Sequence, residues 1–229
     1  MRRERHRVRE DVLSAVRGDF VHRIGSMVRD LALAARLGAA AFRAVRAGSG
    51  SPGDVTVGGT TLVCVSGPDT RSVGAGHWHT AVNLALVTGD RESLAPLVLV
   101  DPAFLADGSA YAAYHEALQE YFRGEDPAPA VERAVHDVEK VRGRGFPPPP
   151  AVLLSQLVEG DEESFNLALL DALEARRDHY AVADRADDSD ADVSLALLGL
   201  ACRARRRGWD VRVDSPYLPA RLLRAAGGA

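Results

Sequence analysis

Two histidines flank a tryptophan in the segment His77-Trp78-His79, and closely spaced histidines are potential metal ligands. On a strand, side chains two residues apart share a face, whereas at the start of a helix they diverge by about 200°. The apolar residues at positions 81, 84 and 85 have helical spacing, which favours the divergent arrangement. No third ligand stands nearby at a motif spacing. We therefore predict no metal site, and we expect Trp78 to serve as a core anchor.

A histidine beside a carboxylate could act as a general acid or base. The residues that could take part are His77, His79, His115, Glu116 and Asp69, with His115–Glu116 and His77–Asp69 as possible pairs. The sequence has no Gly-x-Ser-x-Gly elbow, no His-Glu-x-x-His motif and no nucleophilic cysteine context. Its glycine-rich segment 67–76 lacks a phosphate-binding fingerprint, and the acids from Asp188 onward lack the glycine and glutamate of a calcium loop. We expect no cofactor and no catalysis by the chain on its own.

Aromatic residues form a stripe at helical spacing from Tyr111 to Phe122, which includes Tyr114 and His115. Such a stripe is compatible with packing in a core. It is also compatible with a recognition surface, because one helix of each pair lines a concave face in stacked helical hairpins. Under the second interpretation the partner-binding residues are Trp78, Tyr111, Tyr114 and His115.

Charge is distributed unevenly along the 229 residues, whose formal net charge is −4. Residues 1–50 carry an excess of positive charge, while residues 157–192 contain 12 acids and only three arginines. This pattern favours recognition of another protein over binding of nucleic acid, although a solvated surface is the alternative. The acidic residues predicted to bind a partner are Asp161, Glu162, Glu163, Asp187, Asp188 and Asp190.

The elements that must position these residues repeat along the chain. Helix-like segments end at Gly89, Gly124 and Gly160, spaced by 35 and 36 residues, and Asp90 and Asp161 follow two of them. Glycine closes one helix in the left-handed conformation and aspartate caps the next, so each unit is a helical hairpin. The predicted pairs are 75–88 with 90–106, 109–123 with 127–142, 150–159 with 161–181, and 192–207 with 217–225. We predict a mainly α fold of stacked antiparallel pairs, similar to a tetratricopeptide array.

A single domain of residues 1–229 accommodates these pairs, with 1–10 as a possible flexible arm and 75–225 as the repeats. An alanine-rich helix with a break near Gly38 precedes a small β-hairpin at 54–65, which we expect to pack on the helices. Pro147–Pro150 is a rigid spacer. The sequence has no apolar run long enough to cross a membrane and only two cysteines, which favours a cytoplasmic protein without a membrane partner.

Several of these segments resemble a known family in order and spacing. They are Gly76–Asp90, Tyr111–Phe122, Phe165–Leu169 and Ser215–Pro219. Together they are similar to the actinobacterial immunity 49 family, over roughly residues 24–223. The resemblance implies a helical, cytoplasmic protein that neutralises a cognate polymorphic toxin by binding it, and it implies no catalytic residues. His77 and His79 depart from the asparagine and the hydrophobic residue expected there, and much of the longer N-terminal helical region is missing.

Three functions follow from these observations. The first is an immunity protein that binds a protein toxin and occludes its active site through the acidic region and the aromatic stripe. The second is an enzyme, or an obligate subunit of a heteromeric enzyme in natural-product biosynthesis, with the groove histidines as general bases. The third is a non-catalytic helical-repeat scaffold.

Overall fold

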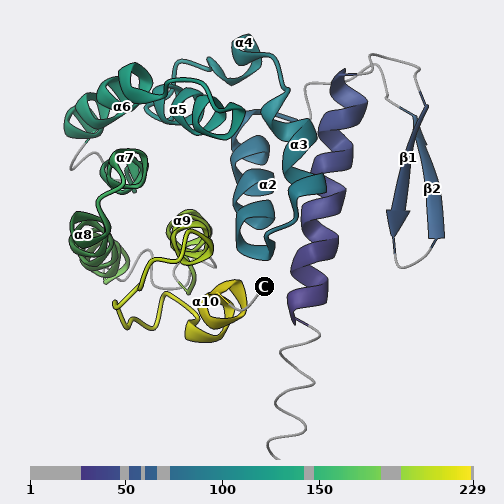
Figure 1. Ribbon diagram of the computed structural model, residues 1–229. Coiled ribbons are helices and arrows are strands. Elements are labelled where there is room, and N and C mark those ends of the chain that lie inside the picture. Colours follow the sequence, from purple (N-terminus) through teal and green to yellow (C-terminus); the bar gives the residue numbers. More distant parts are fainter. Residues whose placement is uncertain are drawn as a thin grey trace, which may run out of the picture.

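The structure is a computed structural model that describes residues 27–46, 52–57, 60–65, 73–141, 147–181 and 192–227. The predicted arm at residues 1–10 lies outside these ranges, as do residues 182–191 of the acidic region 157–192. The described chain is mainly helical, as predicted (Figure 1). The helices after the first are α2 (Ala75–Thr88), α3 (Arg91–Val98), α4 (Pro102–Leu105), α5 (Ala112–Arg123), α6 (Ala128–Val141), α7 (Ala151–Glu159), α8 (Glu162–Tyr180), α9 (Leu195–Arg206) and α10 (Ala220–Gly227).

The first helix, over residues 27–46, runs beside α2 and is the unlabelled purple helix of Figure 1. The sequence predicted a break near Gly38, but the helix is continuous there. A Cβ atom at residue 38 would lie 2.7 Å from the Cβ of Ala81, so this glycine lets the two helices approach closely. Phe42 is buried at the same interface and meets Phe104 edge-to-face, with ring centroids 5.9 Å apart.

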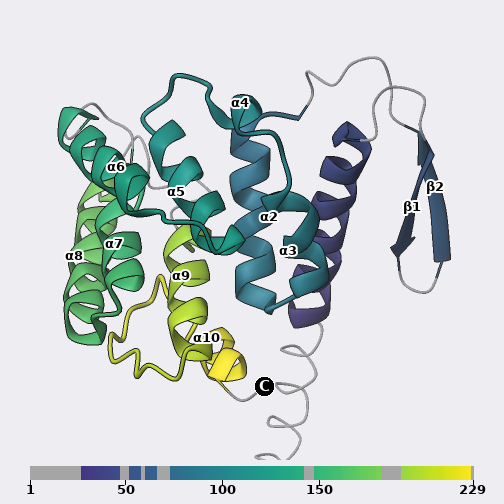
Figure 2. The same cartoon turned by 45° about the horizontal axis from the view of Figure 1, so that its top comes forward.

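Two short strands, β1 (Pro52–Val57) and β2 (Thr60–Val65), pair antiparallel with Val57 opposite Thr60. They occupy the region where the sequence predicted a hairpin. The expectation that they pack on the helices is not met, because both views place them beyond the first helix and apart from the other helices (Figures 1 and 2). The side chain of Val63 is accordingly 66% exposed.

Glycine and aspartate form the turns between paired helices, as the sequence predicted. Gly89, Gly124 and Gly160 have φ angles of 72°, 76° and 84°, and each ends a helix in the left-handed conformation. Asp90 then accepts hydrogen bonds from the backbone N–H groups at the start of α3, and Asp161 accepts one at the start of α8. Local chemistry therefore sets where these helices begin and end.

The predicted helix at 90–106 is in fact two helices, α3 and α4. Pro102 has no backbone N–H to continue a helix, and proline disfavours the helical conformation at the residue before it. Asp101 instead caps α4, accepting a hydrogen bond of 2.9 Å from the N–H of Ala103. Two short helices therefore connect α2 to α5, in place of the single longer helix that was predicted.

The pairs do not form an open tetratricopeptide-like array, in which each repeat would contact only its neighbours. Instead α9 packs against α2, so the last pair meets the first (Figure 2). Two arginines at the end of α9 strengthen this closure. Arg206 donates hydrogen bonds to the carbonyls of Leu86 and Val87 at the end of α2, and Arg207 donates one to Leu157 in α7. A cation at a helix C-terminus is stabilising because the free carbonyls there carry partial negative charge.

The core lies between α2, α5, α7, α8 and α9. Its largest fully buried side chains include Trp78, Tyr114 and Phe165. The indole Nε1–H of Trp78 donates a hydrogen bond of 2.9 Å to the carbonyl of Leu97, so Trp78 is a core anchor, as predicted. Among the helices that the structure describes, none combines the length and apolar character required to cross a membrane.

Candidate functional site

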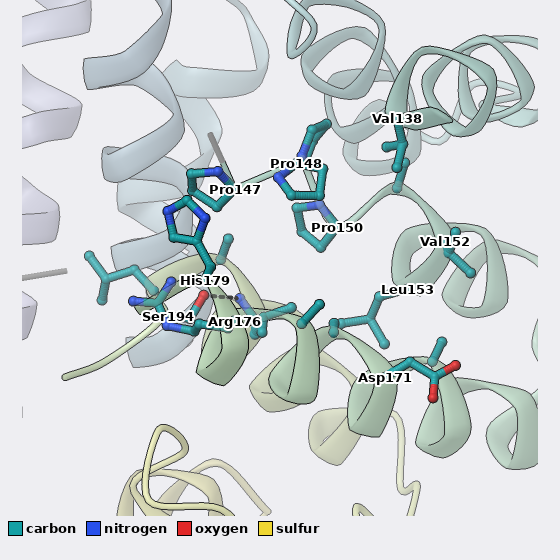
Figure 3. Close-up of a pocket in the computed structure, with 18 of the residues that line it drawn as sticks. Val138, Pro147, Pro148, Pro150, Val152, Leu153, Asp171, Arg176, His179 and Ser194 are labelled. Atoms are coloured by element: carbon teal, nitrogen blue, oxygen red, sulfur yellow. Dashed lines mark hydrogen bonds between the residues drawn. The ribbon is translucent and has the colours of Figure 1, made fainter. Parts of the chain in front are cut away.

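A cleft of about 1080 Å³ opens between helices that are distant in sequence (Figure 3). One side is formed by α2 and the start of α5, and the other by α8 and the first residues of α9. Pro147–Pro150, α7 and Val138 of α6 complete the described walls. This volume is at the upper end of the roughly 300–1,000 Å³ that is usual for small-molecule pockets.

The proline segment forms a firm wall of the cleft. Proline fixes its own φ angle, and the phenol of Tyr111 donates a hydrogen bond of 3.0 Å to the carbonyl of Pro147. The carbonyl of Pro149 in turn accepts a hydrogen bond of 2.8 Å from the N–H of Ala151, where α7 begins. The predicted spacer therefore also sets the shape of this cleft.

Aromatic rings from α2 and the α5 region meet at one end of the cleft. The ring of His79 lies 5.1 Å from that of His115 and 5.5 Å from those of Tyr111 and Tyr114, measured between centroids. Trp78 contacts His115 from the core side at 5.3 Å. Five residues that the sequence analysis selected on two separate helices thus form one cluster, the aromatic–histidine cluster. Trp78 and Tyr114 have no exposed surface, so they support the site rather than contact a partner in this structure.

Burial keeps both histidines of this cluster neutral. Loss of solvent, together with a smaller effect of the nearby His115, lowers the pKa of His79 to about 3. Burial also lowers the pKa of His115 to about 4, although Asp107 acts weakly in the opposite direction. At pH 7 neither imidazole carries a proton charge, and this end of the cleft holds no cationic histidine.

Several polar atoms of the cluster and its surroundings are buried without a hydrogen-bond partner among the described residues. They are Nε2 of His79, Nδ1 and Nε2 of His115, the hydroxyl of Tyr114 and Oδ1 of Asn83. Buried polar groups are almost always hydrogen-bonded in folded proteins. Of this set, His79 and Asn83 line the cleft, but the unpartnered atoms themselves are buried, and a Cβ at residue 199 of α9 would lie 3.1 Å from Oδ1 of Asn83.

The other predicted acid–base residues do not join the cluster. His77 is exposed, and its Nδ1 accepts a hydrogen bond of 3.3 Å from the N–H of Gly74, so it diverges from His79 as predicted. Glu116 forms an ion pair with Arg133 at 2.8 Å rather than a pair with His115. Asp69 lies outside the described residues. Within the described chain, no three potential ligands are grouped closely enough to hold a metal ion.

The predicted acidic residues at the start of α8 take part in local structure. Asp161 caps the helix, Glu162 accepts a hydrogen bond of 2.9 Å from the N–H of Asp210, and Glu163 forms an ion pair with Arg212. Asp187, Asp188 and Asp190 fall outside the described residues.

Sequence reasoning missed a second acidic group further along α8. Asp171, Glu174 and Asp178 line the cleft. Their spacing of three and four residues, on a helix with exposed leucines between Glu163 and Glu174, was the signal that could have found them.

A comparison with protein families supplies the identity of the fold. The family model described as immunity protein 49 matches residues 21–222. The chain belongs to the immunity protein 49 family. No curated protein and no solved structure matches it.

The segments that resemble the immunity protein 49 family contribute mainly to the framework of this member. Trp78, Tyr114 and Phe165 each come from one of those segments, and each is fully buried. His79 also lies in such a segment, but it lines the cleft. This immunity protein 49 member therefore places a neutral histidine, at a position where the sequence analysis expected a hydrophobic residue, at an accessible site.

Proposed function

We propose that the chain is an immunity-type protein that binds a cognate protein toxin and neutralises it by occluding the toxin's active site. The family match over residues 21–222 carries this proposal, because the family's description is that of an immunity protein. Neutralisation by binding needs a surface that recognises another protein. The outer face of α8 supports the presence of such a surface.

Two leucines are exposed on the outer face of α8, and acids surround them. Leu167 is 57% exposed and Leu170 is 43% exposed. With the helical angle of about 100° per residue, they fall on one face of α8 with its exposed acids. The acids of that face are Glu163, Asp171, Glu174 and Asp178. We call this set of six residues the α8 face.

An apolar centre with a charged rim is the usual layout of a protein–protein interface. The 19 residues of α8 extend for about 28 Å, which suits one side of an interface of standard size. Glu163 and Asp178 form ion pairs with Arg212 and Arg177, so the excess negative charge of the rim comes from Asp171 and Glu174. This charge favours a partner with basic residues around its active site, because complementary charge speeds encounter and fixes register. Toxins that act on nucleic acid commonly have such a basic site.

The test uses the toxin encoded beside this chain in the host genome. We expect the purified chain to bind the toxin domain in calorimetry and to protect cells that express it. Replacing both leucines of the α8 face in the variant Leu167→Arg/Leu170→Arg should weaken binding by at least 100-fold and abolish protection. The matched control is Leu99→Arg, since Leu99 is 54% exposed at the end of α3.

Two results would contradict the proposal. One is a wild-type chain that neither binds nor protects against this toxin. The other is an equal effect of the control substitution and the α8 substitutions, which would show that exposed leucines matter only for solubility or folding.

The enzyme hypothesis receives no support from the aromatic–histidine cluster. A general base works best when its pKa lies near the operating pH. The pKa values of about 3 for His79 and about 4 for His115 make both imidazoles weak bases at neutral pH. Their low basicity suits hydrogen bonding to a bound group better than removal of a proton from it.

A further inference from the structure

The cleft beside the α8 face is bounded by small and rigid residues. Ala168, Ala172 and Ala175 line it from α8 at helical spacing, and Pro147–Pro150 stands among the residues of the other walls. Figure 3 shows His179 extending from α8 toward Pro147. Short side chains on one wall leave room for a side chain that enters from outside, and they offer apolar contact to its methylene groups.

The charges that line the cleft are predominantly negative. Among the described residues, three carboxylates from α8 (Asp171, Glu174 and Asp178) line it, against one arginine. Asp178 also forms an ion pair with Arg177 at 2.9 Å, so Asp171 and Glu174 carry most of the excess charge. That cation, Arg176, is already engaged, because its guanidinium lies 4.7 Å above the ring of Tyr180 and donates a hydrogen bond to the carbonyl of Val193. Since burial holds His79 neutral, the lining favours a cationic group over an anion or an uncharged one.

The end of the cleft that holds the aromatic–histidine cluster offers aromatic rings. The rings of His79 and Tyr111 lie there, and Asn83, one turn further along α2, also lines the cleft. The side chain of Asn83 is buried, and neither its Oδ1 nor Nε2 of His79 has a hydrogen-bond partner among the described residues. A guanidinium group stacks on aromatic rings and carries five N–H donors in a plane, whereas an ammonium group is a compact, strongly hydrated charge.

Resting on the proposed function, we propose that this cleft receives an arginine side chain from a basic segment of the bound toxin. The guanidinium stacks against His79 and Tyr111, while Asp171 and Glu174 attract the basic residues that flank it. The α8 face and the cleft then form one continuous recognition surface, with an apolar contact on the outside and an arginine anchor inside.

The first experiment tests the cleft without the toxin. The probes are two blocked tripeptides, Gly-Arg-Gly and its uncharged citrulline analogue, titrated into the full chain and followed by the histidine ring signals in NMR spectra. We expect the arginine peptide to shift the signal of His79 saturably, and the citrulline peptide to bind at least tenfold more weakly. The exposed His136 on α6 serves as the internal control. Equal shifts from both peptides, shifts only at His136, or no shifts would overturn the proposal.

The second experiment separates this proposal from the proposed function. Ala172→Leu narrows the cleft from α8, and Ala225→Leu is the matched control on the exposed side of α10. Variants that keep the wild-type thermal unfolding temperature are compared for toxin binding. We expect Ala172→Leu to weaken binding by at least tenfold and Ala225→Leu to leave it within twofold. Unchanged binding by Ala172→Leu would overturn the arginine anchor while leaving toxin binding intact, whereas a wild-type chain that binds no toxin would overturn the proposed function.

Discussion

Mild acid should destabilise the fold through the two buried histidines of the aromatic–histidine cluster. In the folded chain the pKa is about 3 for His79 and about 4 for His115, below the ordinary value of 6.5. The unfolded chain therefore binds protons more readily in this range, and the free energy of unfolding falls as the pH decreases. The stability from neutral burial is fully present above pH 6.5 and is lost as the pH approaches the folded-state pKa values.

The size of the effect follows from the difference between folded and unfolded pKa values. Relative to pH 7, each histidine lowers the free energy of unfolding by about 0.7 kcal/mol at pH 6 and by about 1.9 kcal/mol at pH 5. The pair together should therefore remove about 3.8 kcal/mol between pH 7 and pH 5. This is a large part of the roughly 5–15 kcal/mol that stabilises an ordinary domain. Carboxylates contribute little in this range, because most of them titrate near pH 4.

The assay is urea unfolding at pH 7, 6 and 5, followed by circular dichroism. The quantity compared is the change in unfolding free energy with pH, so a variant that is less stable at every pH remains informative. We expect His79→Phe and His115→Phe each to remove about half of the change, and the exposed control His77→Gln to retain all of it. A wild-type free energy that is constant from pH 7 to pH 5, or an unchanged pH dependence in both phenylalanine variants, would refute the reasoning.

Three further predictions concern the framework. Gly89→Ala should lower the free energy of unfolding, measured in urea, by about 2–3 kcal/mol, and the control Gly124→Ala should lower it by only about 1 kcal/mol. Both glycines have positive φ angles, but a Cβ at residue 89 would also lie 2.6 Å from Nε of Arg206. Equal losses would contradict the contact with Arg206. Trp78→Phe should cost about 2–4 kcal/mol, since it leaves a cavity and an unpartnered carbonyl in α3, and a cost below about 1 kcal/mol would contradict its role as a core anchor. Cys202 is buried and burial raises its pKa to about 11, so mass spectrometry should find it alkylated by iodoacetamide at pH 8 only after denaturation; rapid alkylation of the native chain would contradict this burial.

The structural features that the sequence predicted correctly are those that depend on interactions between neighbouring residues. Helix ends at Gly89 and Gly160 follow from a left-handed glycine and a capping aspartate, both of which act within a few residues. The split between α3 and α4 has an equally local cause in Pro102, which the apolar periodicity obscured. The closure of the fold could not be predicted in this way, because it depends on Arg206 reaching carbonyls about 120 residues away.

The candidate site shows the same division. The sequence identified His79 and the stripe from Tyr111 to His115, because each is a local pattern on one helix. It could not show that the two patterns meet, since that contact depends on how α2 packs against α5. It also missed the cleft, whose walls come from six separate segments and whose charged residues on α8 look like an ordinary solvated face. Burial then determined the chemistry, because it lowers the pKa of His79 and removes the base that the sequence allowed.

If the chain binds a toxin as proposed, the framework and the recognition surface use different side chains, and this has a consequence for partner choice. Trp78, Tyr114 and Phe165 come from segments that resemble the family and are fully buried, so they cannot distinguish one toxin from another by direct contact. Leu167 is also in such a segment, yet more than half of its side chain is exposed. Specificity requires residues that a partner can touch, and it includes unfavourable contacts with wrong partners as well as favourable ones with the right partner. Substitutions at the exposed positions of the α8 face should therefore change which toxin is bound while leaving stability within about 0.5 kcal/mol, as is usual for surface positions.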